Sequence, residues 1–512
     1  MRPPHPAPMA SRWARTFEVE AACGASSRKP PLAQSREIFA ERKPVLVMDH
    51  REELRSIVGR AHCFAGDEID QRYRTDLLGL YTCSPSCVVR PGSTGEVAQV
   101  MEAARKARIA VTVLGGGTGG VGGTACTDGG IILSLERMNR VLEIDEDVMT
   151  ITAEAGVTLQ SLQEAAAGKG LLMPLDIGSR GSATIGGNIA TNAGGLRTLR
   201  WGMMRDMVLG LEAVLADGTV VSRLGKVLKD NAGYDWKHLF IGSEGTLAIV
   251  TQAVLRLRPL PTTAQTALLA FDTVEQASRL LRRLQRDLDG RLSSFELMWR
   301  DFFNVIGQAQ SARRPLPMSP EYRLYAIVEA LGSHPERDRQ VFEEVLSAIF
   351  DGGLVHDVVI AQSERERQNI WALREDLLEP LAALSPFAGF DISLSLLDMD
   401  RFIEQTDAKM GEMLPGAVVL HYGHGGDGNM HLIVSHPALH DPQVMHATEC
   451  LVYDAIRQYR GSIAAEHGIG QAKLEFLDRS RSREEIALMR SLKQALDPLN
   501  LLNPGKVFPA AG

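Results

Sequence analysis

The amino-acid sequence predicts an α+β fold in two parts, and three observations support this prediction. Residues 86–114 read as strand, helix and strand. Glycine-rich runs at 115–130 and 174–195 lie between short apolar strands. From 263 to about 470, charged amphipathic segments such as 274–288 alternate with short strands such as 322–330. This last pattern is typical of a largely antiparallel sheet flanked by helices.

The length of the chain allows two or three domains, since 512 residues exceed the usual size of one. Residues 1–48 are rich in Pro, Ala, Ser and Arg and contain no central apolar block, so we expect a disordered tail, with an organelle transit peptide as the alternative. Prolines 259 and 261 end a long strand and mark a boundary. We therefore expect one domain at 49–262, a second at 263–470 and a C-terminal segment at 471–512.

Charge and composition exclude several functions. The net charge is −8, the isoelectric point is about 6.0, and Lys and Arg do not cluster, so nucleic acid is not an expected partner. No apolar stretch approaches the roughly 18–20 residues that span a bilayer, so we expect no integral membrane protein and leave peripheral docking open. The six cysteines suit a reducing compartment and predict a cytoplasmic location, and the close pair Cys83 and Cys87 is only a weak metal signal.

The first predicted helix has a clear start. Ser93 is a candidate N-cap, and Glu96 stands three residues later, as in a capping box. Apolar residues at 97, 100, 101 and 104 share one face at helical spacing. With the strands before and after it, this helix gives a βαβ-like beginning.

The glycine-rich run at 115–130 contains the pattern GxGxxG at Gly115, Gly117 and Gly120. A dinucleotide-binding fold would need a helix to begin inside this run, yet each further glycine would destabilise that helix by about 1 kcal/mol relative to Ala. We therefore expect an extended loop whose backbone amides could surround a pyrophosphate, with a flexible surface loop as the alternative.

A second glycine-rich run, at 174–195, precedes an expected hairpin. The pair Asp217-Gly218 lies between two apolar strands and is typical of a tight turn. So many glycines between strands suggest a backbone that lies close to a flat ligand.

The stretch HYGHGGDGNMHL, residues 421–432, predicts another hairpin. If Asp427 and Gly428 form a two-residue turn, His424 lies directly opposite His431, close enough for both imidazoles to bind one ion. His421 then points to the other face and has a structural role. The histidine pair is either half of a metal site or a hydrogen-bonded pair without an ion.

The third candidate ligand lies in SIAAEHGIG, residues 462–470. We expect a short apolar strand that ends at Glu466 and His467, whose side chains diverge, so that Glu466 can face an ion while His467 faces something else. Two histidines and one carboxylate with open positions form a site of the zinc or iron type.

Seven blocks of the sequence carry a family resemblance: GGGTGGVGG, IGGNIATNAGGLR, LGLEAVLADGT, GYDWKHLFIGSEGTL, GHGGDGNMHL, AEHGIG and LDPLNLLNPGKV. In this order, and over residues 50 to 510, the chain resembles the FAD-linked 2-hydroxyacid dehydrogenases of the vanillyl-alcohol oxidase superfamily. The resemblance implies a two-subdomain FAD-binding domain of the vanillyl-alcohol oxidase type, followed by a cap domain that carries the metal site. It also implies that the C-terminal segment returns to the FAD-binding domain.

The resemblance also implies functional residues. The first loop would hold the FAD pyrophosphate with Gly115, Gly116, Gly117, Thr118, Gly119 and Gly120. The residues expected along the cofactor are Gly178, Ser182, Gly187, Asn188, Thr191 and Gly195, with Asn503 from the C-terminal segment. His424, His431 and Glu466 would bind a divalent metal, with zinc as the expected ion. His467 would be the catalytic base, and Arg374 would bind the substrate carboxylate.

Three departures from D-2-hydroxyglutarate dehydrogenase concern the substrate. Leu378, Gly389 and Ile433 stand where that enzyme has polar residues. Each missing contact would cost about 1–3 kcal/mol if a buried carboxylate went unpaired, so a substrate with one carboxylate and a small or apolar tail, such as D-lactate, glycolate or a longer D-2-hydroxy acid, is favoured.

Several alternatives stay open. They are the FAD subunit of a glycolate oxidase complex, a D-2-hydroxyglutarate dehydrogenase, a flavin-binding subunit without catalysis and, from another class, a metal-dependent hydrolase. The expected electron acceptor is external, such as an electron-transfer flavoprotein, a cytochrome or a quinone, and a homodimer is a possible assembly.

Overall fold

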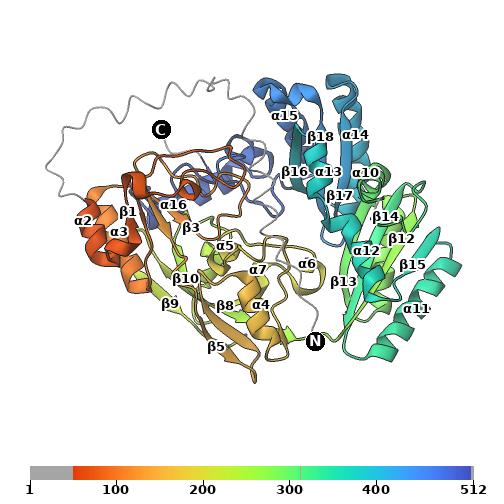
Figure 1. Ribbon diagram of the computed structural model, residues 1–512, viewed down its shortest axis with the longest axis horizontal. Coiled ribbons are helices and arrows are strands. Elements are labelled where there is room, and N and C mark those ends of the chain that lie inside the picture. Colours follow the sequence, from red (N-terminus) through yellow and green to blue (C-terminus); the bar gives the residue numbers. More distant parts are fainter. Residues whose placement is uncertain (1–49, 312, 509–512) are drawn as a thin grey trace.

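The computed structural model describes residues 50–311 and 313–508, which form two lobes (Figure 1). The first lobe contains a four-stranded sheet, a five-stranded sheet and a short two-stranded one, and the second lobe is built on one seven-stranded sheet. The predicted α+β class is confirmed. The tail expected at residues 1–48 lies outside the described residues.

The first sheet has the order β1 (Cys63–Phe64), β2 (Cys87–Val89), β4 (Ile131–Ser134) and β3 (Val111–Leu114). Helix α3 (Thr94–Ala107) connects β2 to β3 and buries the predicted apolar face, and α2 (His50–Val58) packs beside it. Ser93 caps α3 by accepting the N–H of Glu96 at 3.2 Å. The Glu96 carboxylate accepts the N–H of Gly92 at 2.8 Å. A capping box would instead use the N–H of Ser93, so only the Ser93 half of the predicted motif forms.

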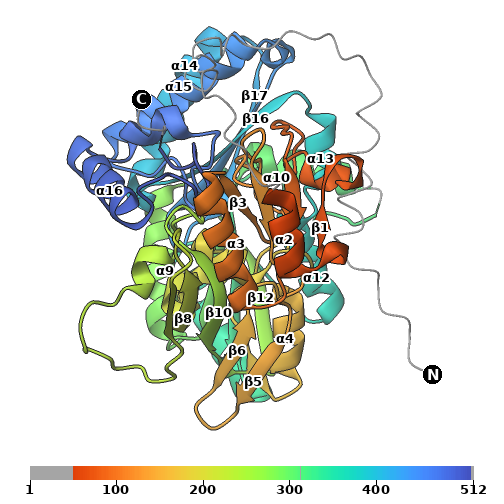
Figure 2. The same ribbon diagram turned by 90° about the vertical axis from the view of Figure 1, so that its left-hand side faces the viewer.

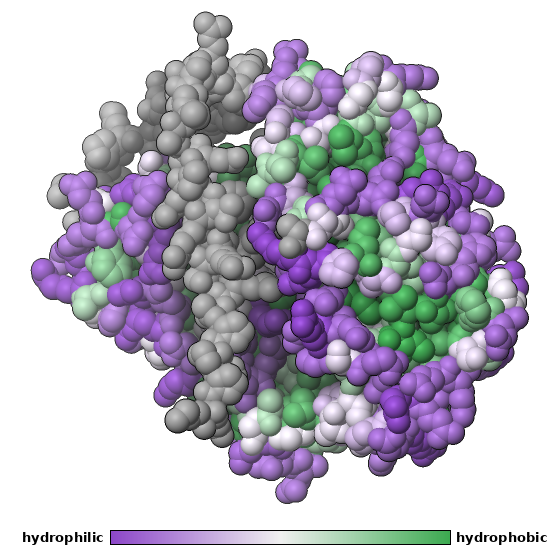
Figure 3. All heavy atoms as spheres, turned by 45° about the vertical axis from the view of Figure 1, so that its right-hand side comes forward, coloured by the Kyte–Doolittle hydropathy of each residue, from purple (hydrophilic) through white to green (hydrophobic). Residues whose placement is uncertain are grey.

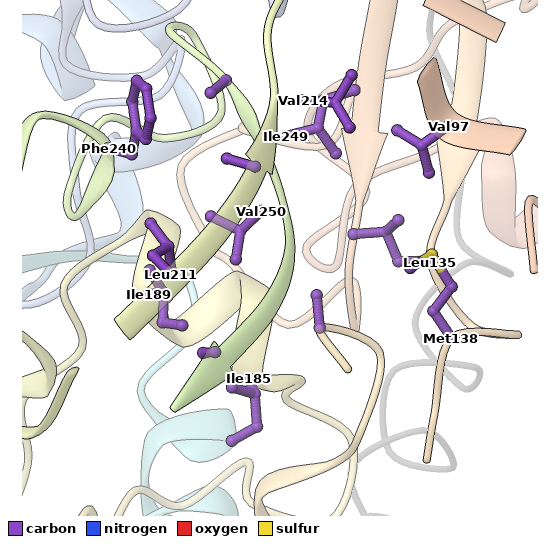
Figure 4. Packing of buried hydrophobic residues seen from close by; sticks show 14 of the residues in the cluster. Val97, Leu135, Met138, Ile185, Ile189, Leu211, Val214, Phe240, Ile249 and Val250 are labelled. Carbon is purple, nitrogen blue, oxygen red and sulfur yellow. The ribbon is translucent and has the colours of Figure 1, made fainter. Parts of the chain in front are cut away.

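The second sheet is antiparallel and has the order β5 (Val141–Asp145), β6 (Thr150–Glu154), β10 (Ile249–Arg256), β8 (Val208–Val214) and β9 (Val220–Arg223). The expected hairpin joins β8 to β9, and Gly218 takes a φ of +91° that favours glycine. Ile185 and Ile189 of α5 (Ile185–Ala190) pack in one core with Leu211 and Val250 of the sheet (Figure 4). The sheet thereby fixes the second glycine-rich run.

Shorter elements complete the first lobe. They are α4 (Leu159–Ala167), α6 (Thr198–Trp201), α7 (Met204–Met207), α8 (Lys237–Phe240), and the two-residue strands β7 (Leu171–Leu172) and β11 (Arg258–Pro259), which pair with each other.

The seven-stranded sheet of the second lobe is antiparallel throughout. Its order is β15 (Asp357–Ile360), β12 (Thr263–Phe271), β14 (Leu324–Gly332), β13 (Leu292–Trp299), β17 (Val418–His424), β18 (Asn429–Ser435) and β16 (Phe387–Ser393).

Helices cover both faces of this sheet. Leu269 and Phe271 of β12 belong to the core shared with α9 (Val274–Asp287), α11 (Pro335–Asp351), α14 (Met399–Met413) and α15 (Pro442–Gln458). Leu268 of the same strand belongs to the core shared with α10 (Arg300–Gln310) and α12 (Glu364–Glu375), near α13 (Leu378–Ala383). Because both faces are buried, the central strands read as continuous apolar runs.

The C-terminal segment contacts the first lobe through α16 (Arg483–Leu496) and the residues that follow it (Figure 2). Leu502 forms a parallel bridge with Val111 of β3. Nζ of the buried Lys493 donates to the carbonyl oxygen of Thr246 at 2.8 Å.

The face in Figure 3 shows several hydrophobic areas, each surrounded by hydrophilic residues. Within residues 50–311 and 313–508, no helix combines the length and the apolar character needed to cross a membrane.

Candidate functional site

The histidine hairpin forms with a register that differs from the prediction. Strands β17 and β18 are joined by four residues, 425–428, and the N–H groups of Asp427 and Gly428 both donate to the carbonyl oxygen of His424 at 3.2 Å. His431 therefore lies opposite Tyr422, and the predicted direct pairing of His424 with His431 is wrong. Because side chains alternate with a period of two, this shift of two residues keeps both histidines on one face, with ring centroids 5.4 Å apart.

His421 points away from this face. Its Nε2 lies 3.3 Å from Oδ1 of Asp407, and its ring contacts Trp299.

The strand expected at residues 462–467 does not form. Ser462 makes an isolated bridge with Ser393, and the chain then turns. The reason is Asp391 on β16: its Oδ2 accepts the N–H groups of Glu466 at 2.8 Å and His467 at 2.9 Å, which a strand ladder would otherwise use. Oε1 of Glu466 is thereby placed 3.7 Å from Nε2 of His424.

The structure brings the three expected metal ligands together. One ligand atom from each of His424, His431 and Glu466 lies within 4.8 Å of the others. His467 is beside them, with Nδ1 3.8 Å from Oδ2 of Asp391, and its side chain is 55% exposed.

Glu296 on β13 holds two of the expected site residues, and its side chain is only 1% exposed. It pairs with His424 across adjacent strands, and its carboxylate lies 2.8 Å from Nδ1 of that histidine. It also accepts the Nε–H of Arg374, from α12, at 3.1 Å. The guanidinium of Arg374 lies 4.7 Å from the centroid of the Tyr422 ring. One buried carboxylate therefore orients both the expected substrate arginine and an expected metal ligand.

The two histidines have opposite protonation preferences. Burial lowers the pKa of His424, but the charge and hydrogen bond of Glu296 outweigh burial and raise that pKa to about 10. Burial and the positive charge of Arg374 lower the pKa of His431 to about 3. Burial would raise the pKa of Asp391, but the charges of His467, His431 and Lys473 lower it.

These residues fit a divalent metal ion. Two imidazoles and one carboxylate are a donor set typical of zinc and iron sites. The contact of Nδ1 of His424 with Glu296 leaves Nε2 facing Glu466, as expected when a carboxylate orients a ligating histidine from behind.

The two glycine-rich runs lie against each other. A Cβ on Gly115 would be 2.6 Å from Oγ1 of Thr184, and one on Gly116 would be 2.0 Å from the carbonyl oxygen of Ser182. Residues 115–123 form no helix, as predicted. On the other side, a Cβ on Gly119 or Gly178 would meet nothing within 4 Å. The loop is therefore packed against the second run at Gly115 and Gly116, and a side chain would have space at Gly119.

Of the other residues expected at the cofactor, three lie in or beside α5. Gly187 and Asn188 lie in α5, and the buried Nδ2 of Asn188 has no hydrogen-bond partner in the structure. Thr191 donates its hydroxyl to the carbonyl oxygen of Gly187 at 3.0 Å. An open glycine loop and an unpaired buried amide fit a polar ligand such as a dinucleotide.

Gly195 and Asn503 instead make protein contacts. The N–H of Gly195 donates to Oγ1 of Thr198 at 3.0 Å. Oδ1 of Asn503 accepts the N–H of Val113 at 3.0 Å, and Nδ2 donates to the carbonyl oxygen of Glu244 at 2.7 Å.

Comparisons with known proteins agree with this arrangement. Residues 85–223 match the family described as "FAD binding domain", and residues 260–507 match "FAD linked oxidases, C-terminal domain". A rice (Oryza sativa subsp. indica) protein named "Probable D-2-hydroxyglutarate dehydrogenase, mitochondrial" is 39% identical over 467 residues, which cover 91% of this chain and 82% of that protein. The chain belongs to the FAD-linked D-2-hydroxyacid dehydrogenases.

Other relatives of the dehydrogenase bear similar names. "D-2-hydroxyglutarate dehydrogenase, mitochondrial" of Bos taurus is 37% identical, with coverage of 95% of this chain and 89% of its own. "D-2-hydroxyglutarate dehydrogenase" of Xanthomonas citri pv. viticola is 37% identical, with coverage of 86% of this chain and 92% of its own. The dehydrogenase therefore binds FAD, and the hydrolase alternative is set aside.

Solved structures share the fold of the dehydrogenase. p-Cresol methylhydroxylase with substrate bound superposes with a TM-score of 0.72 at 16% identity, over 89% of this chain and 96% of the other. Alkyldihydroxyacetonephosphate synthase superposes with a TM-score of 0.69 at 19% identity, over 92% of this chain and 88% of the other. At these identities the likeness concerns the fold alone.

Two acidic residues of the candidate site, Glu296 and Asp391, were not expected from the sequence. Both lie in strands and contact side chains at least 38 positions away in the chain. A signal was present, because each is a carboxylate within a mostly apolar segment, SSFELMW and FDIS. A charged residue at a core position of a strand is itself an indication of a buried partner.

Proposed function

We propose that the dehydrogenase oxidises a D-2-hydroxy acid with one carboxylate and a small or apolar tail, such as D-lactate, to the 2-oxo acid. A divalent ion, expected to be zinc, would be held by His424, His431 and Glu466. Electrons would pass to an external acceptor such as an electron-transfer flavoprotein, a cytochrome or a quinone.

The observation that carries the choice of substrate is the pair Gly389 and Ile433, which lie opposite each other on β16 and β18. Ile433 is 3% exposed and belongs to an apolar cluster with Leu420 and Tyr422. A Cβ on Gly389 would have one neighbour within 4 Å, a ring carbon of Phe387 at 3.8 Å, so this position supplies space and no charge. A second carboxylate would gain no charge-assisted hydrogen bond from either residue.

The roles of the site residues follow from their positions. The guanidinium of Arg374 would bind the substrate carboxylate with the nitrogen atoms that Glu296 leaves available. His467 would accept the hydroxyl proton, and the nearby negative charge of Asp391 would stabilise the imidazolium so formed. A bound divalent ion would supply Lewis-acid polarisation of the hydroxyl oxygen. FAD, when bound, supplies the acceptor for the hydride.

D-2-Hydroxyglutarate is the second candidate, because relatives from plant, animal and bacterium are named for it. A role as the FAD subunit of a glycolate oxidase complex is a further alternative. The relatives from rice and cattle are named as mitochondrial, so the cytoplasmic location expected from the cysteines stays a prediction, as does a homodimer.

The test is anaerobic reduction of the purified protein by single substrates. D-Lactate, D-2-hydroxybutyrate, glycolate and D-2-hydroxyglutarate are each mixed with the FAD-loaded chain in the presence of zinc, and loss of the flavin absorbance is followed. We expect the monocarboxylates to reduce the flavin faster than D-2-hydroxyglutarate at equal concentration. Reduction by D-2-hydroxyglutarate alone would overturn this choice of substrate.

A further inference from the structure

The segment from Glu466 to Ala472 carries the expected base and one expected metal ligand, yet it belongs to no helix or strand. Its backbone N–H groups are bound from two sides. On the side of the seven-stranded sheet, Asp391 accepts the first two, from Glu466 and His467.

On the side of the FAD-binding lobe, Glu244 accepts the next pair. Its Oε1 accepts the N–H of Ile469 and its Oε2 that of Gly470, each at 2.8 Å. The carbonyl oxygen of Val121, in the first glycine-rich run, accepts the N–H of Gln471 at 2.8 Å. The segment 466–472, called the catalytic segment below because it carries the expected base, is therefore hydrogen-bonded to Val121, which directly follows the loop 115–120 expected to hold the pyrophosphate.

Glu244 is in turn fixed by the residues around the cofactor site. Its N–H donates to the carbonyl oxygen of Ala190, the last residue of α5, at 2.8 Å. Its own carbonyl oxygen accepts Nδ2 of Asn503 at 2.7 Å. Its φ of +52° lies in the left-handed region, which side chains other than glycine rarely adopt and which surrounding contacts have to maintain.

The two loops approach each other so closely that a side chain at Gly470 would not fit. A Cβ on Gly470 would lie 2.1 Å from the carbonyl oxygen of Val121, and Gly470 itself has a φ of +52°. A shift of the first glycine-rich run therefore moves the catalytic segment as well.

We propose that Glu244 is a positioning residue that couples the two sites, so that FAD and the divalent ion each strengthen the binding of the other. FAD that contacts the first loop and α5 fixes Val121 and Glu244, and these fix the segment that presents Glu466. With FAD bound, the segment is already ordered, so metal binding no longer has to supply the free energy of ordering it. By thermodynamic linkage, the metal strengthens FAD binding by the same factor. The inference rests on the metal site of the proposed function, but not on its substrate.

The test uses the full-length, FAD-loaded protein without substrate. The dissociation constant of FAD is measured from the flavin fluorescence released on dilution, once with excess zinc and once with a chelator. We expect zinc to lower this constant about 10-fold or more, which is within the usual range of coupling between sites. Zinc affinity of the FAD-loaded protein is measured in parallel.

The variant Glu244→Gln should reduce the zinc effect on FAD to nearly onefold, because an amide offers one oxygen where the carboxylate offers two. The matched control is Glu154→Gln. Glu154 is another carboxylate of the FAD-binding lobe that accepts a backbone N–H, that of Arg140 at 2.9 Å, and it is 2% exposed. The variant Glu154→Gln should keep the full effect of zinc on FAD affinity. It therefore shows whether a general loss of stability, rather than loss of the Glu244 contacts, reduces the coupling.

Equal FAD affinity with zinc and with chelator in the unmodified protein would overturn the proposal, as would an equal loss of coupling in Glu154→Gln. Failure of the proposed function is read from a different measurement, the reduction of the flavin by hydroxy acids. A chain that couples zinc to FAD but is reduced by none of these acids would retain this inference and lose the proposed substrate.

Discussion

The carboxylate of Glu296 lies 2.8 Å from Nδ1 of His424 and is almost completely buried. The two residues face each other on neighbouring strands, so the sheet itself sets their distance. A carboxylate in this position selects the tautomer and the orientation of the imidazole.

Replacing Glu296 by Gln should therefore weaken zinc binding about 10–100-fold, as is usual when the partner of a ligating histidine is lost. Zinc titration of the FAD-loaded protein measures the change. The control is Glu329→Gln, because Glu329 is an equally buried carboxylate of the same sheet that binds Trp371 and Arg367 instead. An equal loss in both variants would show that the effect is only one of stability.

Replacing His467 by Asn should lower kcat by about 10²–10⁴-fold, the usual contribution of a positioned general base, and leave FAD content unchanged. The KM for the hydroxy acid should change little, because Arg374 still binds the carboxylate. His421→Asn is the control, since His421 lies on the other face of the hairpin and should keep kcat within about 2-fold of the unmodified protein. A similar fall of kcat in both variants contradicts the assignment of the base.

Introducing a cation beside Ile433 should alter substrate preference. The change Gly389→Lys places an ammonium where the structure has space, and a charge-assisted hydrogen bond of about 1.5–3 kcal/mol would favour D-2-hydroxyglutarate over D-lactate by about 10–150-fold in kcat/KM. Gly389→Met, of similar length without charge, is the control. No change in the ratio of the two kcat/KM values would mean that the tail of the substrate lies elsewhere.

Removal of the metal should strongly lower activity without loss of flavin when FAD is supplied in excess. Dialysis against a chelator is expected to lower kcat/KM at least about 10-fold, because the hydroxyl proton is then removed without Lewis-acid assistance. Stoichiometric zinc should restore activity. Full activity in protein shown by elemental analysis to be metal-free would exclude the metal from catalysis.

Local sequence signals predicted local structure well. Ser93 caps α3, Asp217 and Gly218 close a hairpin, and residues 115–123 form no helix because glycine opposes one. Each of these outcomes depends on neighbours within a few positions in the chain. The two histidines share a face because alternation along a strand is also a local property.

Contacts between distant segments explain what sequence reasoning missed. Asp427-Gly428 is typical of a two-residue turn, but the carbonyl oxygen of His424 closes a four-residue loop instead. The prediction of a strand before His467 was wrong because Asp391, 76 residues earlier, accepts the backbone N–H of His467 that a strand would use. Nothing adjacent to His467 in the sequence indicates that carboxylate.

The exposure of His467 has a consequence for turnover. More than half of this side chain is in contact with solvent, while Asp391 beside it is fully enclosed. A proton accepted there can pass to water or buffer in one transfer, with no internal relay of side chains. With His467 as the base, the hydroxyl proton would leave directly outward. The electron pair would leave the substrate as a hydride, so the second proton would depart only when the external acceptor takes the electrons.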